Sequence, residues 1–231
     1  MIKNKDIQVI VFDADDTLWS NEPYFRETEA AFCRLLAQYL PQTDVERILL
    51  RIEIANIPLY GYGIKAFILS MIETALEIAG DAFNADLTRQ ILALGTHMLN
   101  QPVVLLEDIE HVLQQLRQRY RLVVATKGDL LDQERKLKKS GLAHYFHHIE
   151  VMSEKDEASY LKLVKHLDVP PGNMLMVGNS LKSDILPVLG IGGHALHIPF
   201  HTTWIHETVS DAIEHDNLYR AETFTQLLSL V

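Results

Sequence analysis

Cysteine is almost absent from the 231-residue chain, which contains one, Cys33. A single cysteine excludes an intramolecular disulfide and suits a reducing compartment. Long hydrophobic runs are also missing, since none reaches the roughly 18 apolar residues that span a bilayer. Met1 is followed by charged residues such as Lys3 and Asp6, so no signal-peptide hydrophobic segment is expected. We therefore expect a soluble, cytoplasmic protein without a membrane partner.

Positive charge is scarce. Lys and Arg number 21 against 31 Asp and Glu, and the formal net charge is −10. A nucleic-acid partner needs a basic surface to neutralise phosphates, so this balance argues against one. A small phosphorylated ligand needs only one local positive pocket and remains compatible. The length allows either one large domain or a core with a smaller insertion.

Short apolar runs rich in Val, Ile or Leu predict buried parallel strands. Most of them end at Gly, Pro, Asp or Thr. The predicted strands are Ile7–Phe12, Arg121–Ala125, His148–Met152, Met174–Val177 and His194–Ile198.

Helical patterns separate most of these strands. They cover Glu107–Arg119, Leu130–Ser140 and Lys155–Leu167, and Gly141 occupies a C-cap position after the second. Alternating strands and helices of this length predict an α/β fold, specifically a three-layer Rossmann-like core around a parallel sheet.

The segment 21–100 breaks this alternation, because it contains four helical patterns and no convincing strand. The predicted helices are Tyr24–Tyr39, Asp44–Ala55, Ile64–Ile78 and Leu87–Leu99. The segment Thr43–Glu46 resembles a capping box, and Pro41, Pro58 and Gly80 are expected at helix ends. We therefore expect a helical domain over residues 21–100, inserted into an α/β core made of 1–20 and 101–231.

The first candidate site segment is Asp13-Ala-Asp15-Asp16-Thr17. Four apolar residues precede Asp13, which places it at the carboxyl end of the first strand, where open parallel sheets bind ligands. Two acidic groups there suit a hard cation and also supply a nucleophile and a proton donor. The alternative is a polar strand exit in which Asp16 or Thr17 caps a helix.

A second segment, Thr126-Lys127-Gly128, follows the strand that begins at Arg121. A hydroxyl at a strand end and a glycine at a helix start favour phosphate, because free backbone N–H groups and the helix dipole attract an anion. An ordinary strand–turn–helix junction has the same pattern, so both interpretations stay open.

Two further segments add a cation and metal ligands. Lys155 lies where Ser153 and Asp156 have the spacing of a capping box, so a solvated lysine in a first helical turn is the alternative. Asn179 and Asp184 follow a strand and offer oxygen ligands to Mg²⁺, although either could instead cap the next helix. Their order along the chain strengthens these signals, since each lies at a strand end or helix start.

In this order the motifs resemble those of the haloacid dehalogenase superfamily, specifically its phosphatase-like members with a helical cap inserted after the first motif. The resemblance covers nearly the whole chain. It implies that Asp13 is the nucleophile, forming an aspartyl-phosphate, and that Asp15 is the general acid/base. It implies that Thr126 donates a hydrogen bond to the transferring phosphoryl group and that Lys155 offsets negative charge on nucleophile and phosphate.

The same resemblance implies Mg²⁺ as cofactor, with ligands expected among Asp13, Asp15, Asn179 and Asp184. Many relatives carry an aspartate at the position of Asn179. Asparagine still supplies an oxygen but one fewer negative charge. We therefore expect either weaker metal binding or a larger share for Asp184.

Candidate substrate-binding residues are Thr17, Lys127, Gly128 and Lys65. Lys65 follows a loop with two glycines and two tyrosines, Pro58–Gly63, which suits either a loop facing the active site or a structural turn. Trp19 is a further specificity candidate.

The leading functional hypothesis is a Mg²⁺-dependent phosphomonoesterase, monomeric or homodimeric, that acts on a small phosphorylated metabolite. A phosphomutase or phosphonatase fits the same resemblance, whereas a dehalogenase needs neither Asp15 as acid/base nor Mg²⁺. From another class, a ligand- or partner-binding protein with little turnover is the alternative that Asn179 favours.

Overall fold

The computed structural model describes residues 2, 6–209 and 213–231. The chain divides into two compact units. The first, called the α/β unit, contains Met1–Glu22, Val103–Lys127 and Gln133–Val231. The second, called the helical unit, contains Pro23–Pro102 and Gly128–Asp132.

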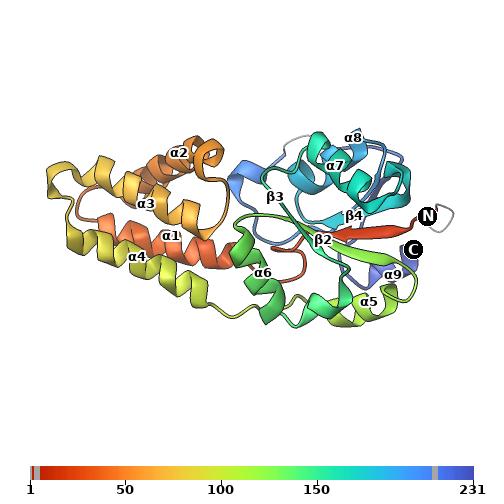
Figure 1. Cartoon of the computed structure of the whole chain (residues 1–231). Coiled ribbons are helices and arrows are strands. Elements are labelled where there is room, and N and C mark those ends of the chain that lie inside the picture. The colour runs from red at the N-terminus through yellow and green to blue at the C-terminus, as the bar shows by residue number, and fades with distance from the viewer. Residues whose placement is uncertain (1, 3–5, 210–212) are drawn as a thin grey trace. The chain divides into compact units, whose positions relative to one another are not determined.

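A six-stranded parallel sheet with the order β3-β2-β1-β4-β5-β6 forms the centre of the α/β unit (Figure 1). Its strands are β1 (Val9–Phe12), β2 (Arg121–Lys127), β3 (Ile149–Met152), β4 (Met174–Gly178), β5 (His194–His197) and β6 (Leu218–Arg220). The first five overlap the predicted apolar runs, with ends that differ by one or two residues. The sixth was not predicted, because its three residues lack an apolar run and none is fully buried.

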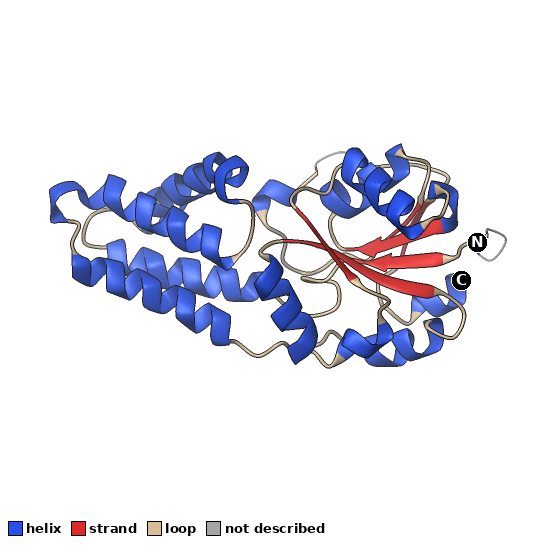
Figure 2. Cartoon of the chain, in the orientation of Figure 1, coloured by secondary structure: helices blue, strands red, loops and turns tan. Residues whose placement is uncertain are grey.

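Alternate residues of β1 face different hydrophobic cores, which accounts for its unbroken apolar sequence. Ile10 and Phe12 belong to a core shared with α5 (Ile109–Leu116) and α9 (Gln226–Leu230). Val9 and Val11 belong to a core on the opposite face, which is shared with α7 (Glu157–Leu167) and α8 (Leu186–Gly190). Helices therefore cover both faces of the sheet, and the predicted three-layer α/β fold is confirmed (Figure 2).

Four helices make up most of the helical unit. They are α1 (Glu22–Leu36), α2 (Gln42–Tyr60), α3 (Ile64–Ala79) and α4 (Ala85–Asn100). In α3, the buried residues Ile64, Phe67, Met71 and Ala75 recur at helical spacing and join the core of this unit. Helix α6 (Leu130–Lys139) begins in the helical unit and continues into the α/β unit.

Two predicted helix ends in the helical unit were wrong. The capping box at Thr43–Glu46 does not start α2, because Pro41 occupies the N-cap and its carbonyl accepts the amides of Asp44 and Val45. Pro58 lies inside α2 rather than after it, and the helix ends at Gly61 in the left-handed region (φ 71°). A proline this close to a helix end removes only one backbone hydrogen bond.

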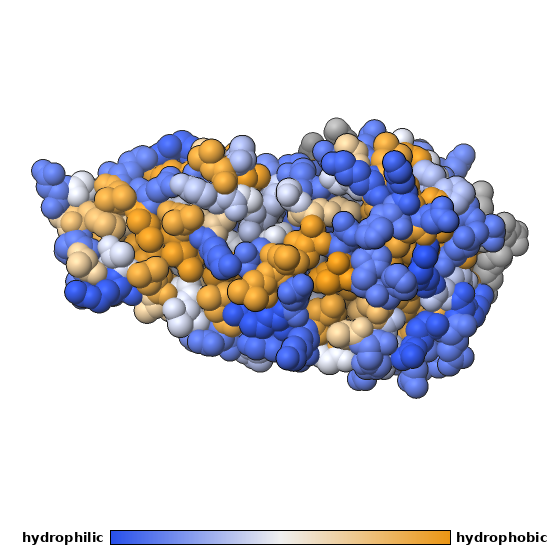
Figure 3. Space-filling view, viewed as in Figure 1, coloured by the Kyte–Doolittle hydropathy of each residue, from blue (hydrophilic) through white to orange (hydrophobic). Residues whose placement is uncertain are grey.

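The face of the chain that Figure 3 shows mixes polar and apolar side chains. Within the residues described, no helix combines the length and apolar character needed to cross a membrane.

Candidate active site

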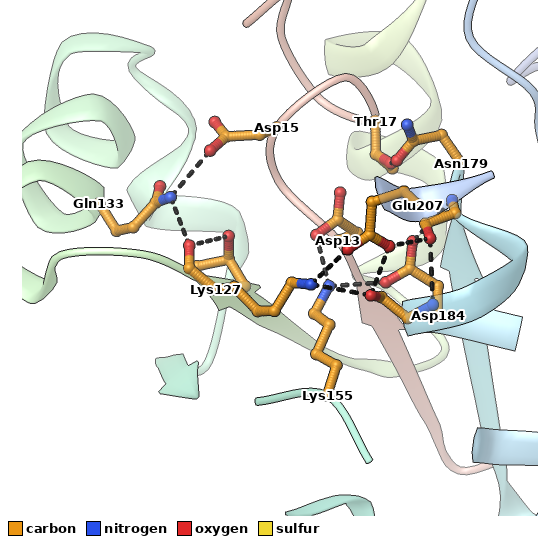
Figure 4. A network of polar contacts seen from close by, with 12 residues as sticks. Asp13, Asp15, Thr17, Lys127, Gln133, Lys155, Asn179, Asp184 and Glu207 are labelled. Atoms are coloured by element: carbon orange, nitrogen blue, oxygen red, sulfur yellow. Dashed lines mark hydrogen bonds and ion pairs between the residues drawn. The ribbon is translucent and has the colours of Figure 1, made fainter. Parts of the chain in front are cut away.

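Asp13 lies one residue beyond β1, and its amide extends the strand by donating to the carbonyl of Val177. Its side chain is buried with that of Lys155, whose Nζ lies 2.5 Å from Asp13 Oδ1. The same Nζ lies 2.6 Å from Asp184 Oδ1. Asp13, Lys155 and Asp184 thus form one buried cluster from three segments far apart in the sequence (Figure 4).

Burial dominates the electrostatics of this cluster. It raises the pKa of Asp13 to about 7, and Asp184 adds to the rise while Lys155 opposes it. For Lys155, burial alone would lower the pKa, but the two carboxylates outweigh it and raise the pKa well above the ordinary value. Lys155 therefore remains an ammonium and stabilises the ionised form of Asp13.

Lys155 is held at the start of α7, although not as predicted. Ser153 does not cap the helix; the N-cap is Asp156, whose carboxylate accepts the amide of Ser159 at 2.7 Å. Lys155 thus precedes the helix, and its buried ion pairs exclude the alternative of a solvated surface lysine.

The segment after β4 supplies Asn179 and Asp184. Asp184 accepts a hydrogen bond from the amide of Ser180 at 3.0 Å, in addition to its ion pair with Lys155. The Oδ1 atom of Asn179 accepts a hydrogen bond from the hydroxyl of Thr17 at 3.2 Å. Asp13, Asn179 and Asp184 provide two carboxylates and an amide oxygen, a donor set that suits a hard divalent cation.

Asp15 does not join the cluster of Asp13 and Lys155. Its carboxylate accepts hydrogen bonds from Trp19 Nε1 at 2.7 Å and from Gln133 Nε2 at 2.8 Å. It also pairs with Lys136 Nζ at 2.6 Å. In this arrangement the Asp15 carboxylate is turned toward Gln133 rather than toward Asp13 and Lys155, so it is a poor candidate for a direct metal ligand beside them (Figure 4).

Asp16 fits the capping alternative. Its buried carboxylate accepts the amides of Asn21 and Glu22, where α1 begins. Burial raises its pKa to about 7 against these hydrogen bonds. Asp16 itself has a positive φ of 62°, which turns the chain after Asp15.

Thr126 and Lys127 are the last two residues of β2. Thr126 is buried, and its hydroxyl donates to the carbonyl of Lys127 at 3.2 Å. Gly128 follows with φ 123°, a conformation that L side chains rarely adopt. The Thr126 hydroxyl therefore lies at the end of β2, as the sequence predicts.

Lys65 and Asp129 form an ion pair within the helical unit, with Lys65 Nζ 2.9 Å from Asp129 Oδ1. Gly63, two residues earlier, would place a Cβ 3.3 Å from the amide nitrogen of Asp129. The loop before α3 thus packs against the segment that follows Gly128, and Lys65 has an acidic partner there.

Glu207 is a site residue that the sequence interpretation missed. It ends a short turn, Ile205–Glu207, after β5. Its carboxylate pairs with Lys127 Nζ at 2.6 Å and accepts the hydroxyls of Ser180 and Ser183 at 2.5 Å each. Burial would raise its pKa, but Lys127 and the serine hydroxyls outweigh burial and lower the pKa to about 2.

One signal could have found Glu207. The loop 199–209 follows a predicted strand, so it reaches the same carboxyl edge as the other site segments. No short sequence motif marks the glutamate, however.

A buried lysine between two carboxylates, at the carboxyl edge of a parallel sheet, indicates a functional site. The chain belongs to the haloacid dehalogenase-like hydrolase family, whose model matches residues 7–190. The predicted superfamily is thereby confirmed.

Three relatives illustrate the similarity. The chain is 30% identical over 141 residues to N-acylneuraminate-9-phosphatase of Mus musculus, covering 59% of this chain and 54% of that protein, so it spans about half the length of that relative. It is 24% identical over 226 residues to the 5-amino-6-(5-phospho-D-ribitylamino)uracil phosphatase YigB of Escherichia coli (strain K12), covering 90% and 87%. A crystal structure of a haloacid dehalogenase-like family hydrolase from Xanthomonas campestris matches with TM-score 0.87 and 35% identity, covering 98% and 92%.

Proposed function

We propose that this protein is a Mg²⁺-dependent phosphomonoester hydrolase that acts on a small phosphorylated metabolite through an aspartyl-phosphate on Asp13. The observation that carries the proposal is the buried lysine, Lys155, paired at once with Asp13 and Asp184. A buried carboxylate can approach a phosphate only where fixed positive charge offsets the repulsion. Lys155 provides that charge beside the nucleophile.

Asp13, Asn179 and Asp184 are the residues that would hold Mg²⁺. Their donors are hard oxygens, and two buried carboxylates share a single lysine, so that their ionised forms leave a net negative charge for a cation to offset. When bound, the metal would shield the phosphoryl oxygens and favour attack by a carboxylate. The Thr126 hydroxyl is proposed to donate to the transferring phosphoryl group.

Asp15 is proposed as the general acid/base, which gives a proton to the leaving oxygen and later removes one from the attacking water. This role requires its side chain to leave Gln133 and Lys136, because these donors occupy both carboxylate oxygens. Thr17, Lys127 and Gly128 are proposed to contact the phosphorylated substrate.

We propose that residues 21–100, which form most of the helical unit, are a cap domain, and that residues 1–20 and 101–231 are the core into which it is inserted. Closure of such a domain would exclude water and select the leaving group. Lys65 is proposed as its substrate contact, released from Asp129 by an anionic substrate. The names of the mouse and Escherichia coli relatives, both phosphatases of small phosphorylated compounds, support this substrate class.

The test is phosphate release from a panel of phosphorylated metabolites, with and without Mg²⁺, by wild type and Asp13→Asn. We expect Mg²⁺-dependent release by wild type and loss of at least about 10³-fold in the variant, the scale seen when a nucleophile is removed. Equal inertness of both proteins across the panel would favour a binding protein with little turnover, as the uncharged Asn179 suggests. Phosphoryl transfer to the substrate without net release would favour a phosphomutase.

A further inference from the structure

Glu207 and Lys127 form a buried ion pair next to the cluster of Asp13, Lys155 and Asp184. Their side chains are 13% and 14% exposed, and Glu207 Oε1 lies 2.6 Å from Lys127 Nζ. Lys127 Nζ also donates to Ser183 Oγ at 2.9 Å, and Ser183 directly precedes Asp184 in the chain. The pair is therefore bonded to the turn that carries Asp184, one of the proposed metal ligands (Figure 4).

The ion pair and the cluster together form a network in which positive and negative charges nearly cancel. Asp13, Asp184 and Glu207 bring three carboxylates, while Lys155 and Lys127 bring two ammonium groups. When all five groups are charged, the network carries one net negative charge. Without Glu207 it would be neutral, and the attraction for a divalent cation would fall.

Asn179 adds no negative charge to the metal site, because its amide supplies an oxygen without a charge. The net charge of the site therefore depends on the other side chains. Glu154 is a second carboxylate near Lys127, with Oε1 3.7 Å from Nζ, and its side chain is 47% exposed. Solvent screens that longer contact far more than the buried pair. Of these two carboxylates, Glu207 therefore does more to offset the charge of Lys127.

We propose that Glu207 is a positioning residue that holds and neutralises Lys127, so that the site formed by Asp13, Asn179 and Asp184 keeps its affinity for a divalent cation. Glu207 acts through Lys127 and through the hydroxyls of Ser180 and Ser183, and it needs no contact with substrate. This inference rests on the proposed function of the site.

The experiment measures Mg²⁺ binding to the full chain by calorimetry, in wild type and in four variants. Glu207→Gln keeps the size of the side chain and removes its charge, and Glu154→Gln is the matched control at the exposed carboxylate. Lys127→Met removes the ammonium group. The double variant Lys127→Met/Glu207→Gln removes both charges, which restores the net charge of wild type.

We expect Glu207→Gln to weaken Mg²⁺ binding by about tenfold, the size of one unit charge acting through a partly screened medium. Glu154→Gln is expected to bind as wild type does. Lys127→Met is expected to bind more tightly, and the double variant to return toward the wild-type affinity. A purely structural role for Glu207 would not produce this recovery.

The inference is overturned if Glu207→Gln binds Mg²⁺ as wild type does, if Glu154→Gln loses as much affinity, if the double variant shows no recovery, or if wild type binds no Mg²⁺. If Glu207→Gln fails to fold by circular dichroism, Lys127→Met decides the question, and unchanged or weaker binding would overturn the inference. Phosphate release is followed in parallel. Wild type that binds Mg²⁺ with the expected pattern but releases no phosphate contradicts the proposed function alone.

Discussion

Lys155 keeps two buried carboxylates, those of Asp13 and Asp184, in one cluster. Burying three charged groups costs solvation free energy that direct pairing only partly offsets, so such a network is weak evidence for stability. Buried charges with strongly shifted pKa values are common at functional sites. The cluster is therefore better explained by the chemistry of the site than by the folding of the chain.

Gly178 makes the close approach of Asp184 to β4 possible. A Cβ at this position would lie 2.3 Å from Asp184 Oδ2, so Gly178→Ala must displace that carboxylate. Because small displacements of catalytic groups are costly, we expect phosphate release to fall on the order of 100-fold. Gly172→Ala is the control, since its nearest atom would be 3.9 Å away. Equal activity of the two variants would show that Asp184 tolerates displacement.

The lowered pKa of Glu207 predicts that its side chain contributes to stability in a pH-dependent way. Its pKa is lowered from 4.5 to about 2 in the folded chain, so its contribution is fully present above about pH 4.5 and is lost as pH falls toward 2. At neutral pH, Glu207→Gln should lower the free energy of unfolding by at most about 3 kcal/mol. The difference should shrink between pH 5 and pH 3 in urea unfolding. A difference that is constant over this range would contradict the lowered pKa.

At the residue scale, the sequence predicts the groups that follow strands directly. Asp13 and Thr126 directly follow an apolar run and Asp184 lies six residues beyond β4, and parallel strands bring such ends to one edge. The sequence does not predict that Asp15 turns toward Gln133, because strand position says nothing about side-chain direction in the following turn. Glu207 also escapes prediction, since it lies ten residues beyond the end of β5.

Helix α7 connects the stability of the α/β unit to the position of Lys155. Asp156 caps its first turn, and Tyr160, Leu163 and Leu167 pack its inner face against the sheet. The cap fixes the direction in which the chain enters the helix, directly after Lys155. The helix start therefore contributes to the geometry of the site.

Asp156→Ala removes this cap and should lower the free energy of unfolding by about 1 kcal/mol. We also expect a lower kcat, because the segment that carries Lys155 loses its anchor. Asn84→Ala is the matched control, since Asn84 caps α4 in the helical unit with hydrogen bonds to Asp86 and Leu87. Chemical unfolding and steady-state kinetics together check both. A similar fall of kcat in Asn84→Ala would show that activity does not depend specifically on the start of α7.

At the element scale, the strands and helices with strong apolar patterns were predicted and the weak ones were not. Buried strands such as β1 and β4 are recognisable because both faces meet a hydrophobic core. The three residues of β6 are partly exposed and carry no such pattern. Pro58 misled because proline usually ends a helix, whereas α2 accommodates it in its last turn.

Over the whole molecule, the net charge of −10 contrasts with a site proposed to bind an anion. The contrast is resolved locally, because Lys127 and Lys155 place positive charge at the carboxyl edge of the sheet. Cations elsewhere need not contribute, since exposed charges are screened over about 10 Å at moderate salt. Substrate binding should therefore depend on these two lysines more than on ionic strength.

Phosphoryl transfer to Asp13 is the step on which the proposed function depends. The direct measurement is rapid acid quenching during turnover of a good substrate with Mg²⁺, followed by mass spectrometry of the peptide that contains Asp13. We predict one added phosphoryl group on Asp13 in wild type and none in Asp13→Asn. Turnover by wild type with no label on this peptide, or an equal label in Asp13→Asn, would contradict the proposed nucleophile.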